Sequence, residues 1–396
     1  MSMKTLFSKL PIYIPKVQDS TIAEIPDLHL SAILIDSQHI AWRPKSAKDV
    51  KKISDLLIVD PVTHCILYKD ASEGKNFQKL PYPKNVDPET LYSNAAFRNE
   101  KIVAPCIEDQ INNGADLIIS PYFFAEDTDD TKFGTNITMI SESIKYLTDH
   151  SISKPLFAMI AIGSTALDRP IVTGYIADRY TVDLNDYLAG YFIVVNDLDC
   201  KQQDGSKLFG LAKLVFQLSK NKSVFVKRIG AFGEVLSAIG GSGFISGLEI
   251  GETFSVKVLE KKPVNYGQQT NRIYIPELFD YVNDVEAQKI GYKCNCKACK
   301  GSLASDRKTK KLHYLYTRLD TMEKLQNLDR DGRINLLISR LNAAFRMAST
   351  YNSKHGLSLK TAHLINWKSI LEASKTWSSE EEGDNLEAFL NDLKSS

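Results

Sequence analysis

Short apolar runs alternate with helix-like segments between about residues 30 and 255, and this predicts an α/β fold, a (β/α)8 TIM barrel. A crowded cysteine motif and helical stretches follow, which predict a zinc-binding insertion and C-terminal helices. With 396 residues, 43% of them hydrophobic, the chain can bury one large core or two ordinary ones. A doubly wound open sheet is the alternative arrangement of the same elements.

Seven apolar runs suit buried parallel strands, because they are short, rich in Ile, Val, Leu and Phe, and mostly bounded by Gly, Pro or Asp. They span residues 31–36, 55–60, 115–123, 155–163, 190–197, 223–230 and 243–250. Between them, segments such as "NITMISESIKYLTDH" and "GLAKLVFQLSK" have the apolar spacing of helices.

Three regions follow from this pattern. We expect a TIM-like barrel over residues 1–255, and a β-rich segment with the zinc-binding loop over residues 256–315. A C-terminal helical region with an acidic tail is expected over residues 316–396, with helices at about 310–327, 330–352 and 359–376.

Composition narrows the class of protein. The 49 basic and 48 acidic residues nearly cancel, so overall charge names no partner. No apolar run is long enough to cross a membrane, and the N-terminal stretch lacks the apolar core of a signal peptide. Three scattered cysteines and three crowded ones are typical of a reducing compartment with one metal site, so we expect a cytoplasmic protein without a membrane partner.

The crowded cysteines form a C-x-C-x-x-C motif of Cys294, Cys296 and Cys299. A structural Zn2+ takes four tetrahedral N or S ligands, of which such a turn supplies three. His313, fourteen residues after the last cysteine, is the expected fourth ligand, with His355 in reserve.

The flanks of this motif are basic. From Lys293 to Arg318 there are eight basic residues and one acidic residue, a net charge of +7. A metal-stapled loop with this charge suits a phosphate backbone, whereas a solvated loop is the simpler interpretation. The candidate nucleic-acid-binding residues are Lys297, Lys300, Arg307, Lys308, Lys310 and Lys311.

The order of barrel, C-x-C-x-x-C and helix resembles the tRNA-guanine transglycosylase superfamily, which includes relatives that insert deazaguanines into DNA. "IEDQINNGADLIIS" (107–120), "KPLFAMIAIGS" (154–164) and "VFVKRIGAFGEVLSAIGGSGFISG" (224–247) are similar to barrel segments of that family. "YLYTRLDTMEKL" (314–325) and "LISRLNAAF" (337–345) resemble its helical pair, so the similarity covers roughly residues 30 to 350.

The resemblance implies base exchange, in which one Asp attacks the anomeric carbon of the sugar and a second Asp moves protons. The proton-transfer Asp falls on Asp60, and the nucleophile aligns near Ser246. The base-recognising Asp falls near Tyr122, so Tyr122 and Ser246 are candidate substrate-binding residues. Two further positions near Ile162 and Leu341 also depart from the pattern. The resemblance further implies pairing of two copies through the metal-bearing region.

Strand ends supply other candidates, because barrels place their sites at the carboxyl ends of strands. His64 follows Asp60 by four residues and is a candidate substrate-binding imidazole, unless "DP" is a simple turn. Asp197 and Asp199 are candidate catalytic carboxylates, with a loop cap as the alternative. Lys227 and Arg228 are candidate substrate-binding residues for a phosphate, and Glu249 is a further carboxylate near the last strand.

The sequence is compatible with three functions. The first is a divergent transglycosylase-like enzyme acting on the N-glycosidic bond of a guanine or deazaguanine base in RNA or DNA. The second is a catalytically degenerate zinc protein that binds nucleic acid, or a partner protein in a DNA-modification or phage-defence complex. The third is an unrelated barrel enzyme acting on a small metabolite. A second carboxylate near Asp60 favours the first function, and a blocked barrel mouth favours the second.

Overall fold

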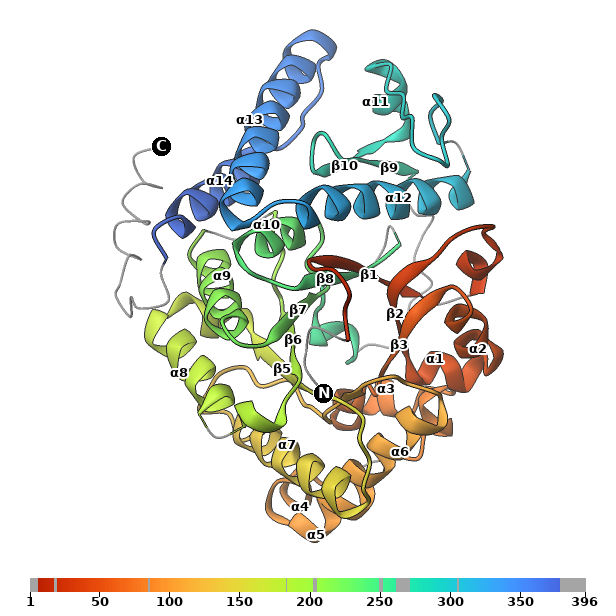
Figure 1. Ribbon diagram of the computed structural model, residues 1–396, viewed down its shortest axis with the longest axis vertical. Helices are drawn as coiled ribbons and strands as arrows, with labels where there is room; N and C mark the ends of the chain where they lie inside the picture. The colour runs from red at the N-terminus through yellow and green to blue at the C-terminus, as the bar shows by residue number, and fades with distance from the viewer. Residues whose placement is uncertain are drawn as a thin grey trace.

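The structure is a computed structural model that describes residues 6–17, 20–84, 86–182, 184–201, 205–248, 252–260, 271–304 and 306–377. It confirms the predicted TIM-barrel-like fold (Figure 1). Eight parallel strands form one sheet in the order β3-β2-β1-β8-β7-β6-β5-β4. The strands are β1 (Ile12–Val17), β2 (Leu30–Asp36), β3 (Ser54–Asp60), β4 (Ile118–Ile119), β5 (Leu156–Gly163), β6 (Gly190–Asn196), β7 (Ser223–Lys227) and β8 (Gly243–Gly247).

One residue links the two ends of this sheet. The backbone N–H of Asp116, just before β4, donates to the carbonyl of Leu57 in β3 at 2.9 Å. The Asp116 side chain in turn accepts from the N–H of Leu57 at 2.6 Å. The sheet is therefore a nearly closed ring.

The first strand is one that the sequence analysis did not identify. β1 has the sequence "IYIPKV", whose Pro15 lacks the N–H of a ladder donor and so weakens the strand pattern. In the structure all six residues are buried, and β1 pairs with β2 on one side and β8 on the other.

Alternation along each strand divides the core in two. One face of each strand points into the barrel, which is filled by side chains such as Ile14, Leu34, Met159 and Phe192. Phe7 joins this interior cluster, with its ring 5.0 Å from that of Phe225. The opposite faces pack against the surrounding helices.

Helices surround the ring and continue into the C-terminal region (Figure 1). They are α1 (Ser37–Trp42), α2 (Lys45–Lys51), α3 (Lys69–Ser72), α4 (Pro88–Ser93), α5 (Ala95–Arg98), α6 (Ala104–Asn112), α7 (Thr131–Asp149), α8 (Pro170–Thr181), α9 (Gly205–Ser219), α10 (Phe232–Ile239), α11 (Asp284–Lys289), α12 (Arg307–Gln326), α13 (Arg330–His355) and α14 (Ala362–Ser374). No helix in the described ranges has the length and apolar character needed to span a bilayer.

Residues 271–304, the predicted metal-binding region, form a smaller part than the barrel and have their own apolar cluster. It contains the antiparallel pair β9 (Arg272–Ile275) and β10 (Asp280–Asn283), then α11 and the cysteine loop. The expected boundary at residue 315 falls inside α12, which extends from the metal site to the start of β1. The acidic tail after residue 377 lies outside the described residues.

Candidate active site and metal centre

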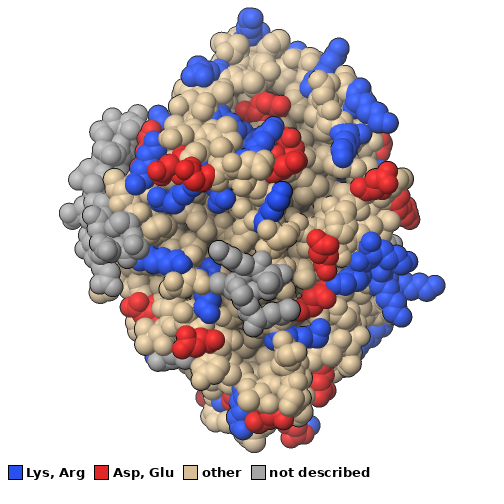
Figure 2. Space-filling view, viewed as in Figure 1, with Lys and Arg blue, Asp and Glu red and all other residues tan. Residues whose placement is uncertain are grey.

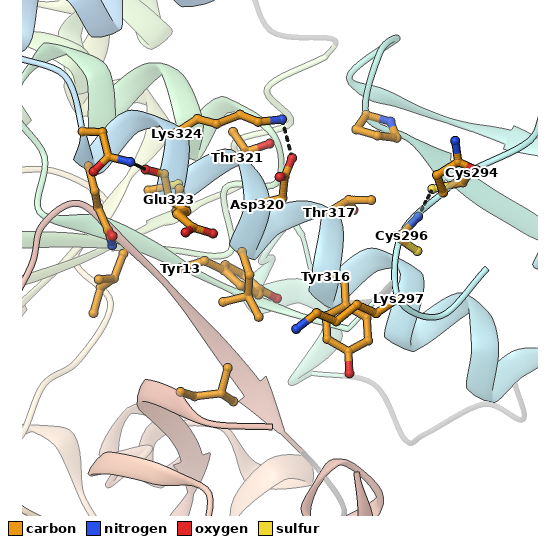
Figure 3. Close-up of a pocket in the computed structure, with 18 of the residues that line it drawn as sticks. Tyr13, Cys294, Cys296, Lys297, Tyr316, Thr317, Asp320, Thr321, Glu323 and Lys324 are labelled. Carbon is orange, nitrogen blue, oxygen red and sulfur yellow. Dashed lines mark hydrogen bonds and ion pairs between the residues drawn. The ribbon is translucent and has the colours of Figure 1, made fainter. Parts of the chain in front are cut away.

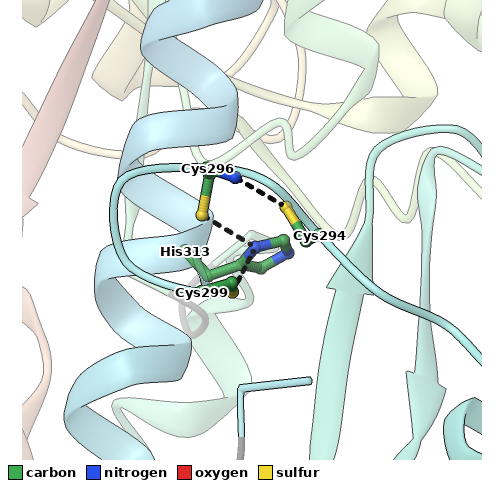
Figure 4. A group of neighbouring side chains, drawn as sticks. All are labelled: Cys294, Cys296, Cys299 and His313. Carbon is green, nitrogen blue, oxygen red and sulfur yellow. Dashed lines mark hydrogen bonds between the residues drawn. The ribbon is translucent and has the colours of Figure 1, made fainter. Parts of the chain in front are cut away.

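The three cysteines and His313 come together as expected. One donor atom from each of Cys294, Cys296, Cys299 and His313 lies within 4.8 Å of the others. Nδ1 of His313 lies 3.5 Å from Sγ of Cys296 and 3.4 Å from Sγ of Cys299 (Figure 4). His355, at the end of α13, is not part of this group.

These distances fit a four-coordinate metal ion. Zn–S bonds of about 2.3 Å and Zn–N bonds of about 2.0 Å place tetrahedral donors roughly 3.5 Å apart. The second ring nitrogen of His313, Nε2, lies 2.6 Å from the carbonyl of Tyr274, to which it can donate while Nδ1 faces the sulfurs. The residues present therefore suit a metal ion.

Local sequence explains why His313 is in place. Asp306 caps α12 by accepting from the N–H of Thr309 at 2.9 Å, so the helix begins immediately after the cysteine loop. His313 then lies near the second turn of the helix and is fully buried. The cysteine loop itself is tight, because the N–H of Gly301 returns to the carbonyl of Cys294.

The candidate nucleic-acid-binding residues do not share one environment. Lys297, Lys300, Arg307 and Lys308 are exposed, and Lys311 is half-buried. Lys310 is buried, and its ammonium binds both carboxylate oxygens of Asp284 at 2.7 and 2.6 Å. The prediction for Lys310 is therefore corrected, because this lysine braces α12 against α11 and is not presented to a phosphate backbone.

A second basic surface lies on α1 and α2, which the sequence analysis did not single out. Arg43, Lys45, Lys48 and Lys52 are exposed there, and the guanidinium of Arg43 stacks 4.1 Å from the ring centre of Trp42. Figure 2 shows basic side chains both over this region and over the metal-binding region, with acidic side chains between them. An exposed aromatic ring among cations is a common feature of nucleic-acid-binding surfaces.

A groove of about 1300 Å³ separates α12 and the cysteine loop from the segment before β2. Lys297 and Tyr316 lie together at one part of it, and Asp320 pairs with Lys324 further along α12 (Figure 3). The groove contains charges of both signs, so its lining does not select one sign of ligand.

The mouth of the barrel holds the other concentration of charge. At the carboxyl ends of their strands, interior positions are occupied by Lys16 of β1, Asp36 of β2, Asp60 of β3 and Lys227 of β7, all buried. Lys16 pairs with Asp36 at 2.7 Å, and Lys227 forms an ion pair with Asp60. Four strand-to-strand steps separate β7 from β3, so the Lys227–Asp60 pair spans the ring.

The Asp60 side chain is almost fully buried, with 1% of its surface exposed. Its Oδ1 accepts from the phenol of Tyr122 and from the N–H of Val62, both at 3.0 Å, and its Oδ2 faces Lys227. Burial alone would raise the pKa of Asp60, but the charges of Lys227 and Lys16 outweigh it and hold the pKa well below its usual range. Asp60 is therefore a carboxylate at every physiological pH.

Aromatic rings cover these four charged side chains at the barrel mouth. Phe124 and Phe254 stack with ring centres 4.5 Å apart, and His64 lies 5.0 Å from Tyr122 and 5.1 Å from Phe124. Burial is the main reason that the pKa of His64 falls to about 3, so its imidazole is neutral. Its Nδ1 is buried and has no hydrogen-bond partner within the described ranges.

Phe254 comes from the segment 252–260, which follows β8 and folds over the mouth. The N–H of Val256 donates to Oδ1 of Asn196 at 2.8 Å, and the N–H of Asp197 donates to the carbonyl of Phe254 at 2.9 Å. Beneath this segment the cavity is about 60 Å³, room for only a few water molecules.

Backbone strain marks the same end of the barrel. Val62, Asp197 and Arg228 follow β3, β6 and β7, and each has a positive φ of 51 to 56°. This conformation is costly for residues other than glycine and gathers at functional sites. Arg228 also presents its guanidinium to the ring of Phe254, 5.3 Å from the ring centre.

Ser246 lies on the other side of the barrel wall. Because Ile245 points into the barrel, its neighbour points outward, where its hydroxyl lies 3.0 Å from that of Tyr314 on α12. The prediction that Ser246 meets substrate is corrected by this alternation. The interior position at the end of β8 is Gly247, which pairs with Lys16 and has no side chain to offer.

The predicted catalytic pair of Asp197 and Asp199 does not join Asp60. Asp197 pairs with Lys257 at 3.1 Å and is partly exposed, and Asp199 accepts from the N–H of Lys201. The carboxylate that lies beside Asp60 is Asp36, its register partner on β2. The strand periodicity of "SAILID" contained this signal, since its last residue shares the interior face with Ala32 and Leu34. Glu249 lies outside the described residues.

The comparisons with protein-family models and with curated proteins do not assign the chain to a family. No protein-family model matches the chain, and a search of curated proteins finds no match.

Proposed function

We propose that the protein acts on the N-glycosidic bond of a guanine or deazaguanine base in RNA or DNA, as a divergent transglycosylase-like enzyme. The observation that carries this proposal is the buried Asp60–Lys227 pair beneath a layer of aromatic rings at the barrel mouth. Buried charges are costly to desolvate, and their concentration at one cleft is typical of catalytic sites.

The aromatic layer supports a flat substrate. Phe254 lies nearly parallel to Phe124, with 12° between the ring planes, so a nucleobase that displaced Phe254 would stack on Phe124 in its place. Nδ1 of His64, which lacks a partner in the described part of the chain, is a polar contact for the edge of such a base. The segment 252–260 has to move for this exchange, because the cavity beneath it is smaller than a purine.

Features outside the barrel mouth support the proposals that the substrate is a nucleic acid and that the protein binds Zn2+. The three cysteine sulfurs and one imidazole of the metal centre are the donor set that a structural zinc ion takes in proteins. Exposed cations on the cysteine loop, on α12 and on α1–α2 are suited to phosphate groups. The ion supplies stability to the loop, and the barrel residues supply the chemistry.

The test is base exchange by the purified protein. It is incubated with bulk tRNA and with duplex DNA in the presence of labelled guanine or a labelled deazaguanine, and incorporation is counted. We expect incorporation that Asp60→Ala abolishes. Asp199→Ala, which removes an aspartate from a different strand end, is the matched control and should keep activity. Absence of incorporation and of base release with both nucleic acids contradicts the proposal.

A second candidate function is supported by the small closed mouth. A protein that has lost the reaction but keeps the barrel and the metal loop would bind nucleic acid or a partner protein without changing it. Salt-dependent binding without exchange or base release, unaffected by Asp60→Ala, would favour this function.

A further inference from the structure

We propose that Asp60 and Lys227 divide one glycosyl transfer between them, with Oδ2 of Asp60 attacking the anomeric carbon and the Lys227 ammonium protonating the departing base. This inference rests on the proposed function. It reverses the role that the family resemblance implies for Asp60, which there moves protons, and it supplies the nucleophile that Ser246 cannot.

The contacts of Asp60 identify the attacking oxygen. Oδ1 is occupied by the phenol of Tyr122 and the N–H of Val62, which fix the orientation of the carboxylate. Oδ2 points to Lys227, so it becomes available when that lysine gives up a proton. Burial, followed by the negative charge of Asp60, raises the pKa of Tyr122 well above its usual range, so the phenol remains a donor.

Charge explains why the two roles are assigned in this way. Asp60 remains ionised, so it has no proton to donate and cannot act as the acid. Its negative charge instead suits it to stabilise the developing oxocarbenium ion and to attack it. Lys227 is 3% exposed and carries the proton nearest to Oδ2. His64 is neutral and Asp36 is paired with Lys16, so neither competes for the acid role.

The step balances. The bond between the anomeric carbon and the base nitrogen breaks, and its electron pair stays with the base, which takes a proton from Lys227. A bond forms between Oδ2 and the anomeric carbon, giving a glycosyl ester. The buried ion pair becomes two neutral groups, so no net charge is created in the barrel. An incoming base returns its proton to the Lys227 amine as it displaces the carboxylate, which restores the pair.

The experiment separates the two roles by changing the leaving base. The substrates are RNA and DNA oligonucleotides that carry either a single guanine or a single 7-methylguanine. The 7-methylguanine is positively charged while it is attached to the sugar, so it leaves as a neutral base without taking up a proton. Release of each base is measured for the wild type, Asp60→Asn, Lys227→Met and Lys227→Arg. Lys227→Arg preserves the positive charge beside Asp60 but is a very weak acid. Lys145→Met, on an exposed lysine of α7, is the matched control.

We expect both Lys227 variants to release guanine about 100-fold more slowly than the wild type, the usual contribution of a general acid. Their release of 7-methylguanine should stay within about tenfold of the wild type, because that base needs no general acid. Asp60→Asn should lose both activities. The wild type should form a covalent adduct with the nucleic acid on a denaturing gel, and hydroxylamine should cleave it as an ester.

Two results would overturn the division of roles while leaving the proposed function intact. One is a wild type that releases guanine while the Lys227 variants lose both bases equally. The other is a wild type whose activity survives in both Lys227 variants. A wild type that releases neither base from either nucleic acid contradicts the proposed function itself, and the inference with it.

Discussion

The metal centre and the barrel mouth both gather buried polar groups, but they satisfy them differently. At the metal centre, three sulfurs and an imidazole surround a common point and present lone pairs to it. At the mouth, two aspartates and two lysines neutralise one another across the barrel. The first arrangement has the donor set of a metal site, whereas the charges of the second neutralise one another and have to separate before they can meet a ligand.

The largest effect should come from the metal centre. His313→Ala removes one of four ligands, and we expect the loss of bound metal and of at least about 5 kcal/mol from the free energy of unfolding of the metal-binding region. Metal content per chain and thermal unfolding measure this. His355→Ala is the matched control, and a variant of His313 that kept full metal content would exclude it as a ligand.

Breaking the charge pair at the mouth should come next. Lys227→Met leaves Asp60 buried without its partner, and we expect a loss of about 3–5 kcal/mol in the free energy of unfolding, measured in denaturant. The double variant Asp60→Leu with Lys227→Met should recover most of that loss, because it removes both charges. Equal destabilisation of the single and double variants would show that the pair is not the source of the effect.

The buried histidine at the barrel mouth should make the stability of the protein sensitive to acid. The pKa of His64 is about 3 in the folded protein against about 6.5 in an unfolded chain, so the unfolded chain binds the proton more strongly between those values. Stability therefore falls as the pH falls through this window, by about 3 kcal/mol between pH 7 and pH 4. His64→Phe should remove that part of the acid sensitivity, as measured by denaturant unfolding at both pH values. An unchanged difference between the two pH values would argue against a neutral buried imidazole.

The smallest effect on stability is expected at the surface of the cysteine loop. Lys300→Ala with Lys308→Ala should change the free energy of unfolding by less than about 0.5 kcal/mol. It should reduce the salt dependence of duplex DNA binding by about 0.9 for each lost phosphate contact, in the slope of log affinity against log salt. Lys310→Ala is the contrasting variant, since its pairing with Asp284 predicts a loss of stability and no change in slope. Identical slopes for all of the variants would place nucleic acid elsewhere.

The difference between the two regions also explains what could be predicted from sequence. Three of the four candidate metal ligands lie within six residues and the fourth follows in the first turns of one helix, so spacing alone was sufficient to predict that they lie together. Most barrel strands could also be predicted from local sequence, because each is a short run rich in Ile, Val and Phe. β1 was missed because Pro15 interrupts its pattern.

The mouth could not be derived in this way. Asp60 was identified from its place at a strand end, but its partner Lys227 is 167 residues away and meets it only when the ring closes. Asp36 was overlooked because its importance comes from the register of β2 with β3. Ser246 was placed on the wrong side, since a shift of one residue in a strand exchanges interior and exterior.

The position of β1 has a consequence for how the chain folds during synthesis. β1 precedes the other seven strands of the sheet in the chain, yet one of its two neighbours, β8, is made more than 200 residues later. The glutamine that binds the carbonyl of Pro11, Gln326, is made later still. Until those segments emerge from the ribosome, one edge of β1 and the edge of the growing sheet that it will join remain unpaired. The ring therefore cannot close around β1 until β8 has been synthesised, and the start of β1 gains the contact of Gln326 only after α12 has followed.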